Sequence, residues 1–312
     1  MTDARHEFGG EWTELKLEAI SAYSQFFTGA IGGRFDLWYV DPFAGTGERT
    51  AKEQVGGLLE QRPVGTIEKQ YPGSAARALS INPPFDHFRF GDSNRRHVSA
   101  LEELISRYPD RDAAVIRGDA NGFIQDMFGR PPWSLADRGS RPPRALVFLD
   151  PYGLEVKWQT LEVLARSQKA DVWYLVNLKA ALQQLARKHE RLDASKRAAL
   201  FECFGTENWE DEFYKTTRLG GLFGEVEEKT VRTADKREVA TFQRTRLAEL
   251  FAYVSEPLAL TVGSMDDYFL LYCMSNNPSP AARKLIDKGA SWVIQRYNQA
   301  SRYKARPSNA GR

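Results

Sequence analysis

A glycine-containing loop, Asp41-Pro42-Phe43-Ala44-Gly45-Thr46-Gly47, is the first segment whose residue types could do chemistry. Gly45 and Gly47 have no Cβ, so the backbone there can turn tightly and come close to a ligand. The loop follows the apolar run 35–40, and open α/β sheets bind nucleotides at the carboxyl ends of their strands. Neither the third glycine of the dinucleotide fingerprint nor the Gly-Lys-Ser/Thr of a P-loop follows. The pattern predicts a cofactor-binding loop, and a simple connecting turn is the alternative.

Two further aspartates follow predicted strands. Asp92 lies in the segment Gly91-Asp-Ser-Asn94, and Asp119 lies in Gly118-Asp-Ala-Asn121. A carboxylate accepts hydrogen bonds from ribose hydroxyls or from an adenine amino group. Asp92, Asp119 and the adjacent Ala120 are therefore candidates for contacts with a ligand bound at this edge of the sheet. A role as strand-end turn residues is the alternative for both aspartates.

The segment Asp150-Pro151-Tyr152-Gly153 follows the most regular apolar run of the chain, residues 145–149. Asp150 is predicted to orient a nucleophile next to the cofactor, and the four residues together are predicted to form the catalytic segment. The alternative is that Asp150 and Pro151 end the strand while Tyr152 lies in the core.

Short apolar runs and helical patterns alternate over residues 35–177, and these elements must position the loops. The predicted strands are 35–40, 87–90, 113–117, 145–149 and 171–176, and the predicted helices are 12–31, 98–108, 121–128 and 158–166. Such regular alternation predicts a mostly parallel sheet with helices on both faces. Residues 258–262 and 268–274, around a turn at Gly263-Ser264, are predicted to add an antiparallel pair, and a helix is expected over 281–299. The predicted fold is α/β and Rossmann-like, with one antiparallel strand near the edge.

Residues 178–250 depart from this alternation. Charged helical patterns over 180–192 and 195–204, without a convincing strand, predict a helical insertion. The expected organisation is a helical segment at 1–34, the cofactor-binding core at 35–177, the insertion at 178–250, a terminal hairpin and helix completing the core at 251–299, and a flexible basic tail at 300–312.

The composition sets limits on function. The chain has 312 residues and a formal net charge of only +2, which is not the charge of a polycationic nucleic-acid coat. Cys203 and Cys273, the only cysteines, are predicted to be reduced buried thiols, because two cysteines form neither a disulfide framework nor a cysteine zinc site. The four histidines lack metal-ligand spacing, so no metal is expected. No signal-peptide pattern and no apolar run of about 20 residues is present, which predicts a cytoplasmic protein without membrane contact.

Two basic stretches are candidates for binding nucleic acid. The first lies in the insertion and comprises Arg187, Lys188, His189, Arg191, Lys196 and Arg197. The second lies at the C-terminal end, where Trp292, Tyr297 and Tyr303 alternate with arginines and lysines. Such residues can contact phosphates and stack on bases. A solvated helix face is the alternative for both stretches.

The strand and loop at 35–47 resemble motif I of the class I S-adenosylmethionine-dependent methyltransferases, especially the amino-methylating DNA enzymes. The resemblance implies that the glycine loop passes along the methionine part of the cofactor, that Asp92 binds the ribose and that Asp119 approaches the adenine. The segment at Asp150 resembles the Asp/Asn-Pro-Pro-Tyr/Phe motif that holds the target amine in these enzymes. It has one proline fewer, so Tyr152 does not align directly with the aromatic residue that stacks on an extruded base.

A further resemblance covers nearly the whole chain. Its segments are Trp12–Leu17, YVDPFAGTG, FLDPYG with Glu155–Leu161, DVWYLV, Phe204–Trp209 and Tyr272–Asn277. Together they are similar to the three-Cys-motif partner proteins (TcmP), a bacterial and phage-associated family named after a neighbouring, radical-SAM-like protein with three cysteines. The family's acidic residue after the second strand usually follows isoleucine, whereas Gly91 precedes Asp92 here. The resemblance implies a methyltransferase-like fold with S-adenosylmethionine as cofactor, and a three-Cys-motif protein as partner.

Three hypotheses on function follow. The first is a methyltransferase acting on nucleic acid or on a nucleic-acid-associated target. The second is a non-catalytic or weakly catalytic binding partner of a three-Cys-motif protein, with the insertion as its docking surface. The third, a nuclease-like enzyme on a similar sheet, has no paired-carboxylate metal motif to support it.

Overall fold

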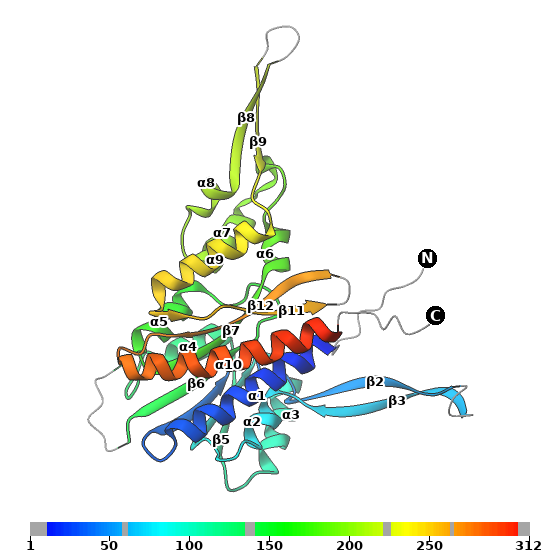
Figure 1. Cartoon of the computed structure of the whole chain (residues 1–312), viewed down its shortest axis with the longest axis vertical. Coiled ribbons are helices and arrows are strands. Elements are labelled where there is room, and N and C mark those ends of the chain that lie inside the picture. The colour runs from blue at the N-terminus through cyan, green and yellow to red at the C-terminus, as the bar shows by residue number, and fades with distance from the viewer. Residues whose placement is uncertain (1–10, 58–61, 135–140, 221–225, 263–264, 305–312) are drawn as a thin grey trace.

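The structure is a computed structural model that describes residues 11–57, 62–134, 141–220, 226–262 and 265–304. Its centre is an eight-stranded sheet (Figure 1) with the order β10-β12-β7-β6-β1-β4-β5, to which β11 adds by pairing with β12. The strands are β1 (Asp36–Asp41), β4 (His87–Asp92), β5 (Asp112–Arg117), β6 (Pro143–Leu149), β7 (Ala170–Asn177), β10 (Tyr253–Val254), β11 (Leu258–Val262) and β12 (Met265–Ser275). The strands from β7 to β5 run parallel, whereas β12 is antiparallel to β7, β10 and β11. This confirms the predicted methyltransferase-type, Rossmann-like sheet with a reversed strand near one edge.

Helices cover both faces of the sheet. They are α1 (Glu11–Ile31), α2 (Ser74–Leu79), α3 (Arg95–Ser106), α4 (Ala120–Phe128), α5 (Trp158–Ser167) and α10 (Pro280–Lys304). Strand β6 shows why the central strands are apolar throughout: Val147 and Leu149 pack with α4 and α5, while Leu146 and Phe148 pack in the cluster with α1, α2, α3 and α10. Alternate side chains point to opposite faces and both faces are buried, so the polar positions of a half-exposed strand are absent.

The insertion after β7 contains helices and also a β-ribbon. Its helices are α6 (Leu178–Gln184), η1 (His189–Arg191), α7 (Ala194–Phe204), α8 (Trp209–Phe213) and α9 (Lys236–Leu250). The prediction that this segment has no strand is wrong, because β8 (Tyr214–Gly220) pairs with β9 (Val226–Arg232). The described side chains near its base are largely exposed, for example residues 215–217 and 228–229. A ribbon that buries neither face has no apolar alternation, and therefore gave no strand signal.

The predicted helix over 180–192 is also wrong in its second half. Helix α6 ends at Gln184, and the chain then turns to run beside β9, where Lys188 forms a bridge with Val231 and the Arg187 carbonyl accepts a hydrogen bond from the Arg232 amide. Because β9 supplies hydrogen-bond partners to the backbone of residues 187 and 188, these residues do not have to form helical hydrogen bonds.

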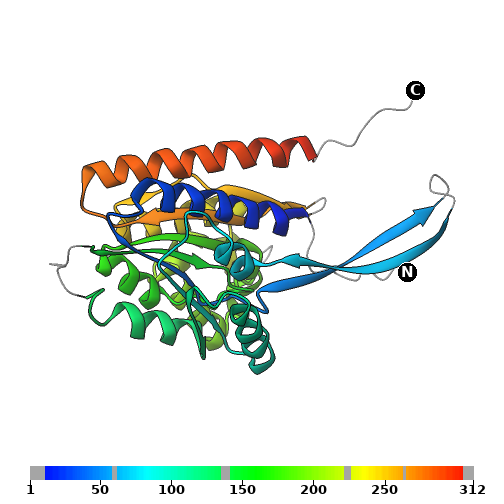
Figure 2. The same cartoon turned by 90° about the horizontal axis from the view of Figure 1, so that it is seen from below.

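A second ribbon, β2 (Glu48–Gly57) with β3 (Arg62–Pro72), was not predicted. It extends away from the sheet beside the ends of the parallel strands (Figure 2). The ribbon lies in the sequence between the glycine loop and α2, so 26 residues separate Gly47, the last residue of the loop, from Ser74, the first residue of the helix that follows it.

The C-terminal helix is longer than predicted. α10 extends to Lys304, so residues 300–304 of the predicted flexible tail are helical. Residues 1–10 of the predicted N-terminal segment, the Gly263-Ser264 turn and residues 305–312 lie outside the described residues.

Candidate cofactor and acceptor site

A cavity of about 1100 Å³ lies at the carboxyl ends of β1, β4, β5 and β6. We call it the cofactor cavity. Most residues predicted to contact cofactor or acceptor line it: Pro42, Phe43, Ala44, Gly45, Thr46, Gly47, Asp92, Asp119, Ala120, Asp150, Pro151 and Tyr152. Strand β1 lies between β6 and β4, so the cavity is at the point where the strand order reverses direction, which is where such sheets bind their ligands.

The glycine loop has the backbone conformation that its sequence predicts. Gly45 and Gly47 have φ angles of +60° and +74°, which favour glycine. A Cβ at Gly45 would meet nothing within 4 Å, so this position is open. A Cβ at Gly47 would lie 2.5 Å from Leu104 Cδ2, so this glycine is needed for packing against α3. The two glycines therefore have separate roles.

Helix α2, which follows the β2-β3 ribbon in the sequence, also contributes to the wall of the cofactor cavity. The Gly73 amide donates to the Gly47 carbonyl at 2.9 Å, and a Cβ at Gly73 would lie only 2.7 Å from that oxygen. This close approach brings Ser74, the first residue of α2, onto the cavity wall. The glycine loop and the helix that usually follows it are thus adjacent in space despite the intervening ribbon.

Asp41 does not line the cavity but lies fully buried beneath the loop. Its Oδ1 accepts a hydrogen bond from the Phe43 amide at 3.1 Å, which holds the start of the loop. Burial raises the pKa of Asp41 to about 7, and the charge of Asp150 adds to the rise, while Ser74, the Phe43 amide and Lys16 oppose it. Asp41 is therefore positioned to shape the loop from behind.

This buried carboxyl predicts a pH-dependent stability. The pKa of Asp41 in the folded protein is about 7 and its ordinary value is 3.8, so the folded state binds the proton more tightly than the unfolded chain does. The stability from this group is fully present below pH ~4 and is lost as the pH rises to about 7. Between those pH values, the free energy of unfolding should fall less in Asp41→Asn than in the unchanged protein, by an amount on the order of a few kcal/mol.

Urea unfolding at a series of pH values measures this difference. Asp171 is also buried with its pKa raised to about 6, so some slope must remain in the variant. Asp126→Asn serves as the control, because Asp126 is 75% exposed and pairs only across the surface with Arg130. Equal slopes for Asp41→Asn and the unchanged protein would contradict the assignment.

Asp92 and Asp119 both lie at the cavity, on adjacent strands. Asp92 Oδ1 accepts from the Asn94 amide at 2.7 Å, and its Oδ2 lies 3.1 Å from His97 Nδ1. Asp119 caps α4 by accepting from the Gly122 amide at 2.9 Å. Both aspartates thus have the local hydrogen bonds expected of turn residues at the end of a strand, which was the alternative to ligand binding. It does not compete with ligand binding, because each carboxylate oxygen has more than one acceptor position.

Asp150 is bound by a residue that sequence reasoning missed. Lys16 Nζ lies 2.7 Å from Asp150 Oδ1 and 2.6 Å from Oδ2, and the lysine side chain is only 5% exposed. Its ammonium also lies 4.9 Å from the centre of the Trp12 ring. A cationic amine group therefore occupies both oxygens of the carboxylate that was predicted to hold an acceptor.

The loop after Asp150 is fixed from two sides. The Glu155 carboxylate accepts from the Gly153 amide at 2.6 Å, and Asn177 Nδ2 donates to the Tyr152 carbonyl at 2.7 Å. Buried Asn121 joins this loop to α4 by donating to the Glu155 carbonyl at 2.8 Å. These bonds give Asp150 a defined position at the end of β6.

The side chain of Tyr152 is 76% exposed and lines the cavity, so the alternative that placed it in the core is wrong. Gly153 does not line the cavity. Across from the loop, Trp12 stacks on Phe269 with ring centres 4.9 Å apart, and Tyr268 lies next to them on β12. The acceptor side of the cavity is thus rich in aromatic residues.

Sequence reasoning also missed Trp12, Lys16, Ser74, His97 and Phe269 as wall residues. Lys16 is 134 residues from Asp150, and nothing in its local pattern distinguishes it from other lysines of an amphipathic helix. Only His97 had a local signal, because it lies one helical turn after the predicted Asp92 segment.

Other kinds of site have no support among the residues that the structure describes. No group of three or more metal-binding side chains occurs there. Both cysteines are free and buried, as predicted, and burial raises the pKa of the Cys203 thiol to about 12. In the described part of the chain, no helix has the length and apolar character needed to cross a membrane.

No protein-family model and no curated protein matches the sequence. Among solved structures, protein LPL1258 of Legionella pneumophila, assigned to the family model DUF519, is 11% identical with a TM-score of 0.47, covering 94% of this chain and 96% of that one. Precorrin-6y C5,15-methyltransferase of Geobacter metallireducens is 11% identical with a TM-score of 0.32, covering 73% and 88%. TYW2 of M. jannaschii in complex with AdoMet is 11% identical with a TM-score of 0.29, covering 73% and 79%. The strand order, rather than these likenesses, defines the fold of this chain.

Proposed function

We propose that this protein binds S-adenosylmethionine and transfers its methyl group to a base of a nucleic acid. One observation supports this above all others: a single cavity brings together the glycine loop, Asp92, Asp119 and Asp150 from the ends of four adjacent strands. The cavity therefore has residues suited to a nucleoside cofactor on one side and a polar group suited to an acceptor on the other.

The residues present fit this cofactor. The open space at Gly45 can accept the methionine part, Asp92 can accept hydrogen bonds from the ribose hydroxyls, and Asp119 with Ala120 lies where the adenine would be. When bound, the cofactor supplies a methyl group on a positively charged sulfur. The ring of Phe43 and the aliphatic wall of the loop help to exclude water from that sulfur.

On the acceptor side, the protein mainly has to align the nucleophile. Methyl transfer requires the attacking atom, the methyl carbon and the sulfur to lie in line. Asp150 is placed to accept a hydrogen bond from an acceptor amine and to orient its lone pair. The Lys16 ammonium donates to both oxygens of Asp150, and an acceptor amine would donate to the acceptor positions of these oxygens that the lysine does not use.

The aromatic walls favour a planar acceptor. Exposed Tyr152 and the stacked pair of Trp12 and Phe269 all line the cavity. Aromatic side chains bind bases that have left the helical stack, which is how enzymes act on the edge of a base. This is the reason for choosing a nucleic-acid base rather than an aliphatic amine.

Calorimetric titration with S-adenosylmethionine and with its demethylated product tests the cofactor half of this proposal. A tritiated-methyl assay on DNA, RNA and protein fractions tests the acceptor half. We expect heat of binding with both compounds and incorporation into a nucleic-acid fraction. Absence of any binding would overturn the whole proposal, and label in protein alone would overturn its acceptor.

Asp92→Ala should weaken cofactor binding by about 10- to 100-fold, because hydrogen bonds to a charged group contribute about 1.5–3 kcal/mol. Calorimetry gives the dissociation constant directly. His97→Ala is the matched comparison: it removes the group beside Asp92 Oδ2 but leaves the carboxylate, so its effect should be smaller. A larger loss in His97→Ala would show that the histidine, and not Asp92, binds the cofactor.

A second candidate function is that of a binding partner of a three-Cys-motif protein, with little or no catalysis. The Lys16 ammonium on Asp150 favours it, since the ion pair already gives this carboxylate a structural role. Cofactor binding without methyl transfer to any fraction, and capture of a three-Cys-motif protein through the insertion, would favour this candidate over the first.

A further inference from the structure

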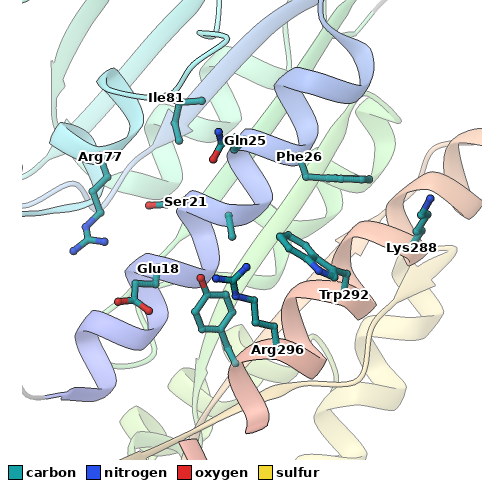
Figure 3. Close-up of a pocket in the computed structure, with 11 residues that line it drawn as sticks. Glu18, Ser21, Gln25, Phe26, Arg77, Ile81, Lys288, Trp292 and Arg296 are labelled. Atoms are coloured by element: carbon teal, nitrogen blue, oxygen red, sulfur yellow. The ribbon is translucent and has the colours of Figure 1, made fainter. Parts of the chain in front are cut away.

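A second cavity, of about 700 Å³, lies between α1, α2 and α10. We call it the helical groove. Figure 3 shows Trp292 and Arg296 reaching from α10 toward α1, with Arg77 of α2 on the opposite side and Lys288 at one end. None of the residues predicted to contact the cofactor or the acceptor lines this groove. Trp292 and Tyr297, from the basic C-terminal stretch of the sequence, do line it.

The groove combines an exposed aromatic ring with positive charge. Trp292 is 46% exposed, and the Arg296 guanidinium lies 5.6 Å from the centre of its ring. Three basic side chains line the groove, Arg77, Lys288 and Arg296, against one acidic side chain, Glu18. An aromatic ring with an adjacent guanidinium in a positive groove is the arrangement that binds single-stranded nucleic acid through base stacking and phosphate contacts.

Helix α10, which carries Trp292, is basic by sequence. Its sequence contains six basic residues (Arg283, Lys284, Lys288, Arg296, Arg302 and Lys304) and one acidic residue, Asp287. This excess contrasts with the near-neutral chain as a whole, whose formal net charge is +2. As a ligand for helix α10, a polyanion is therefore a better electrostatic match than a protein surface of average charge.

The groove is adjacent to the cofactor cavity. Helix α1 provides Lys16 to the cofactor cavity and Glu18 to the groove, and α2 provides Ser74 to the first and Arg77 to the second. α10 runs antiparallel to α1 beside it, so its C-terminal half lies near the α1 end that carries Trp12 and Lys16 (Figures 1 and 2).

We propose that the helical groove binds the single-stranded segment that flanks the methylated base, with a neighbouring base stacked on Trp292 and phosphates at Arg296 and Lys288. This rests on the proposed function, since it assumes that the acceptor in the cofactor cavity is a base. It adds where the rest of the substrate lies, and it predicts a preference for unpaired nucleic acid, because stacking on Trp292 requires a base without a stacked neighbour.

Fluorescence anisotropy with labelled single-stranded DNA and RNA oligonucleotides tests this in the full chain. Trp292→Ala should weaken binding by about 5-fold or more, as expected for the loss of one stacked base, and Trp292→Phe should restore part of it. Arg296→Glu should weaken binding and lower the slope of log affinity against log salt by about 1.

Two control variants match these changes outside the groove. Phe201→Ala removes an aromatic ring of the same 46% exposure on α7, and Arg237→Glu makes the same charge reversal at an exposed position of α9 that does not line the groove. Both should leave oligonucleotide affinity within about twofold, which is the effect expected of surface changes away from a site. Thermal melting of every variant confirms that it is folded.

The outcomes separate this proposal from the function on which it rests. Loss of oligonucleotide binding in the Trp292 and Arg296 variants with unchanged S-adenosylmethionine affinity supports the groove. Equal losses in the control variants, tighter binding of duplex than of single strands, or binding only of a partner protein would overturn it. Absence of S-adenosylmethionine binding in the unchanged protein would overturn the proposed function, whatever the oligonucleotides do.

Discussion

Asp150→Asn should lower the rate of methyl transfer by about 100-fold or more while leaving S-adenosylmethionine affinity nearly unchanged. Asparagine keeps the size of the side chain but cannot accept hydrogen bonds on two charged oxygens, so it orients an acceptor amine poorly. Asp150 lines the cavity, and we propose that it contacts the acceptor and not the cofactor, which is why cofactor binding should persist. Single-turnover transfer of tritiated methyl and calorimetric titration of the cofactor measure the two effects separately.

The Lys16 ammonium is the main complication in this experiment. It is buried, and Asp150→Asn removes its counterion, so the variant should also lose stability. Lys16→Met combined with Asp150→Asn removes the unpaired charge and should recover stability without recovering transfer. Asp126→Asn is the surface control. An Asp150→Asn protein with normal transfer would show that Asp150 serves only to bind Lys16.

Alanine at Gly47 and at Gly45 should produce two different defects. Gly47→Ala should lower the free energy of unfolding by about 2–4 kcal/mol, because it adds left-handed backbone strain to a Cβ that would press on Leu104 and Leu101. Gly45→Ala has the strain alone, about 1–2 kcal/mol, since its Cβ would meet nothing within 4 Å. That Cβ would instead occupy the open space assigned to the cofactor, so its affinity should fall by about 10-fold or more, the equivalent of 1.4 kcal/mol.

Urea unfolding and calorimetric titration on both variants test this division. Gly29→Ala is the matched control, because Gly29 is exposed on α1, its Cβ would also meet nothing within 4 Å, and alanine favours helix. We expect that change to be neutral or slightly stabilising. If Gly45→Ala bound the cofactor normally, the glycine loop would not be the cofactor cradle.

Much of the fold could be predicted because burial leaves a direct mark on the sequence. β6 and β7 are buried on both faces, so their runs of apolar residues were evident. The two ribbons could not be predicted in the same way. β2, β3, β8 and β9 belong to two-stranded sheets outside the central one, and their sequences contain charged residues throughout. Strands are recognised by an apolar face, and a ribbon outside the core need not have one.

The candidate site divides in the same manner. The glycine loop and the four strand-end aspartates were found because each lies in a short segment whose type and position have a local physical reason. The exception among them is Asp41, which burial places beneath the loop instead of on the cavity wall. Lys16 and Phe269 come from α1 and β12, which are far in the sequence from the loops they approach, so local pattern has no information about them.

The sequence by itself thus determined the loop to which we assign cofactor binding, since its turn is encoded within seven consecutive residues, Asp41 to Gly47. The tertiary structure alone decided the acceptor side. Packing of α1 across the sheet brings the Lys16 ammonium to Asp150 over a separation of 134 residues, and it places α1 beside Trp292 of α10. The reason is physical: backbone conformation is a local property of a few residues, whereas a contact between buried charges depends on how distant elements share one core.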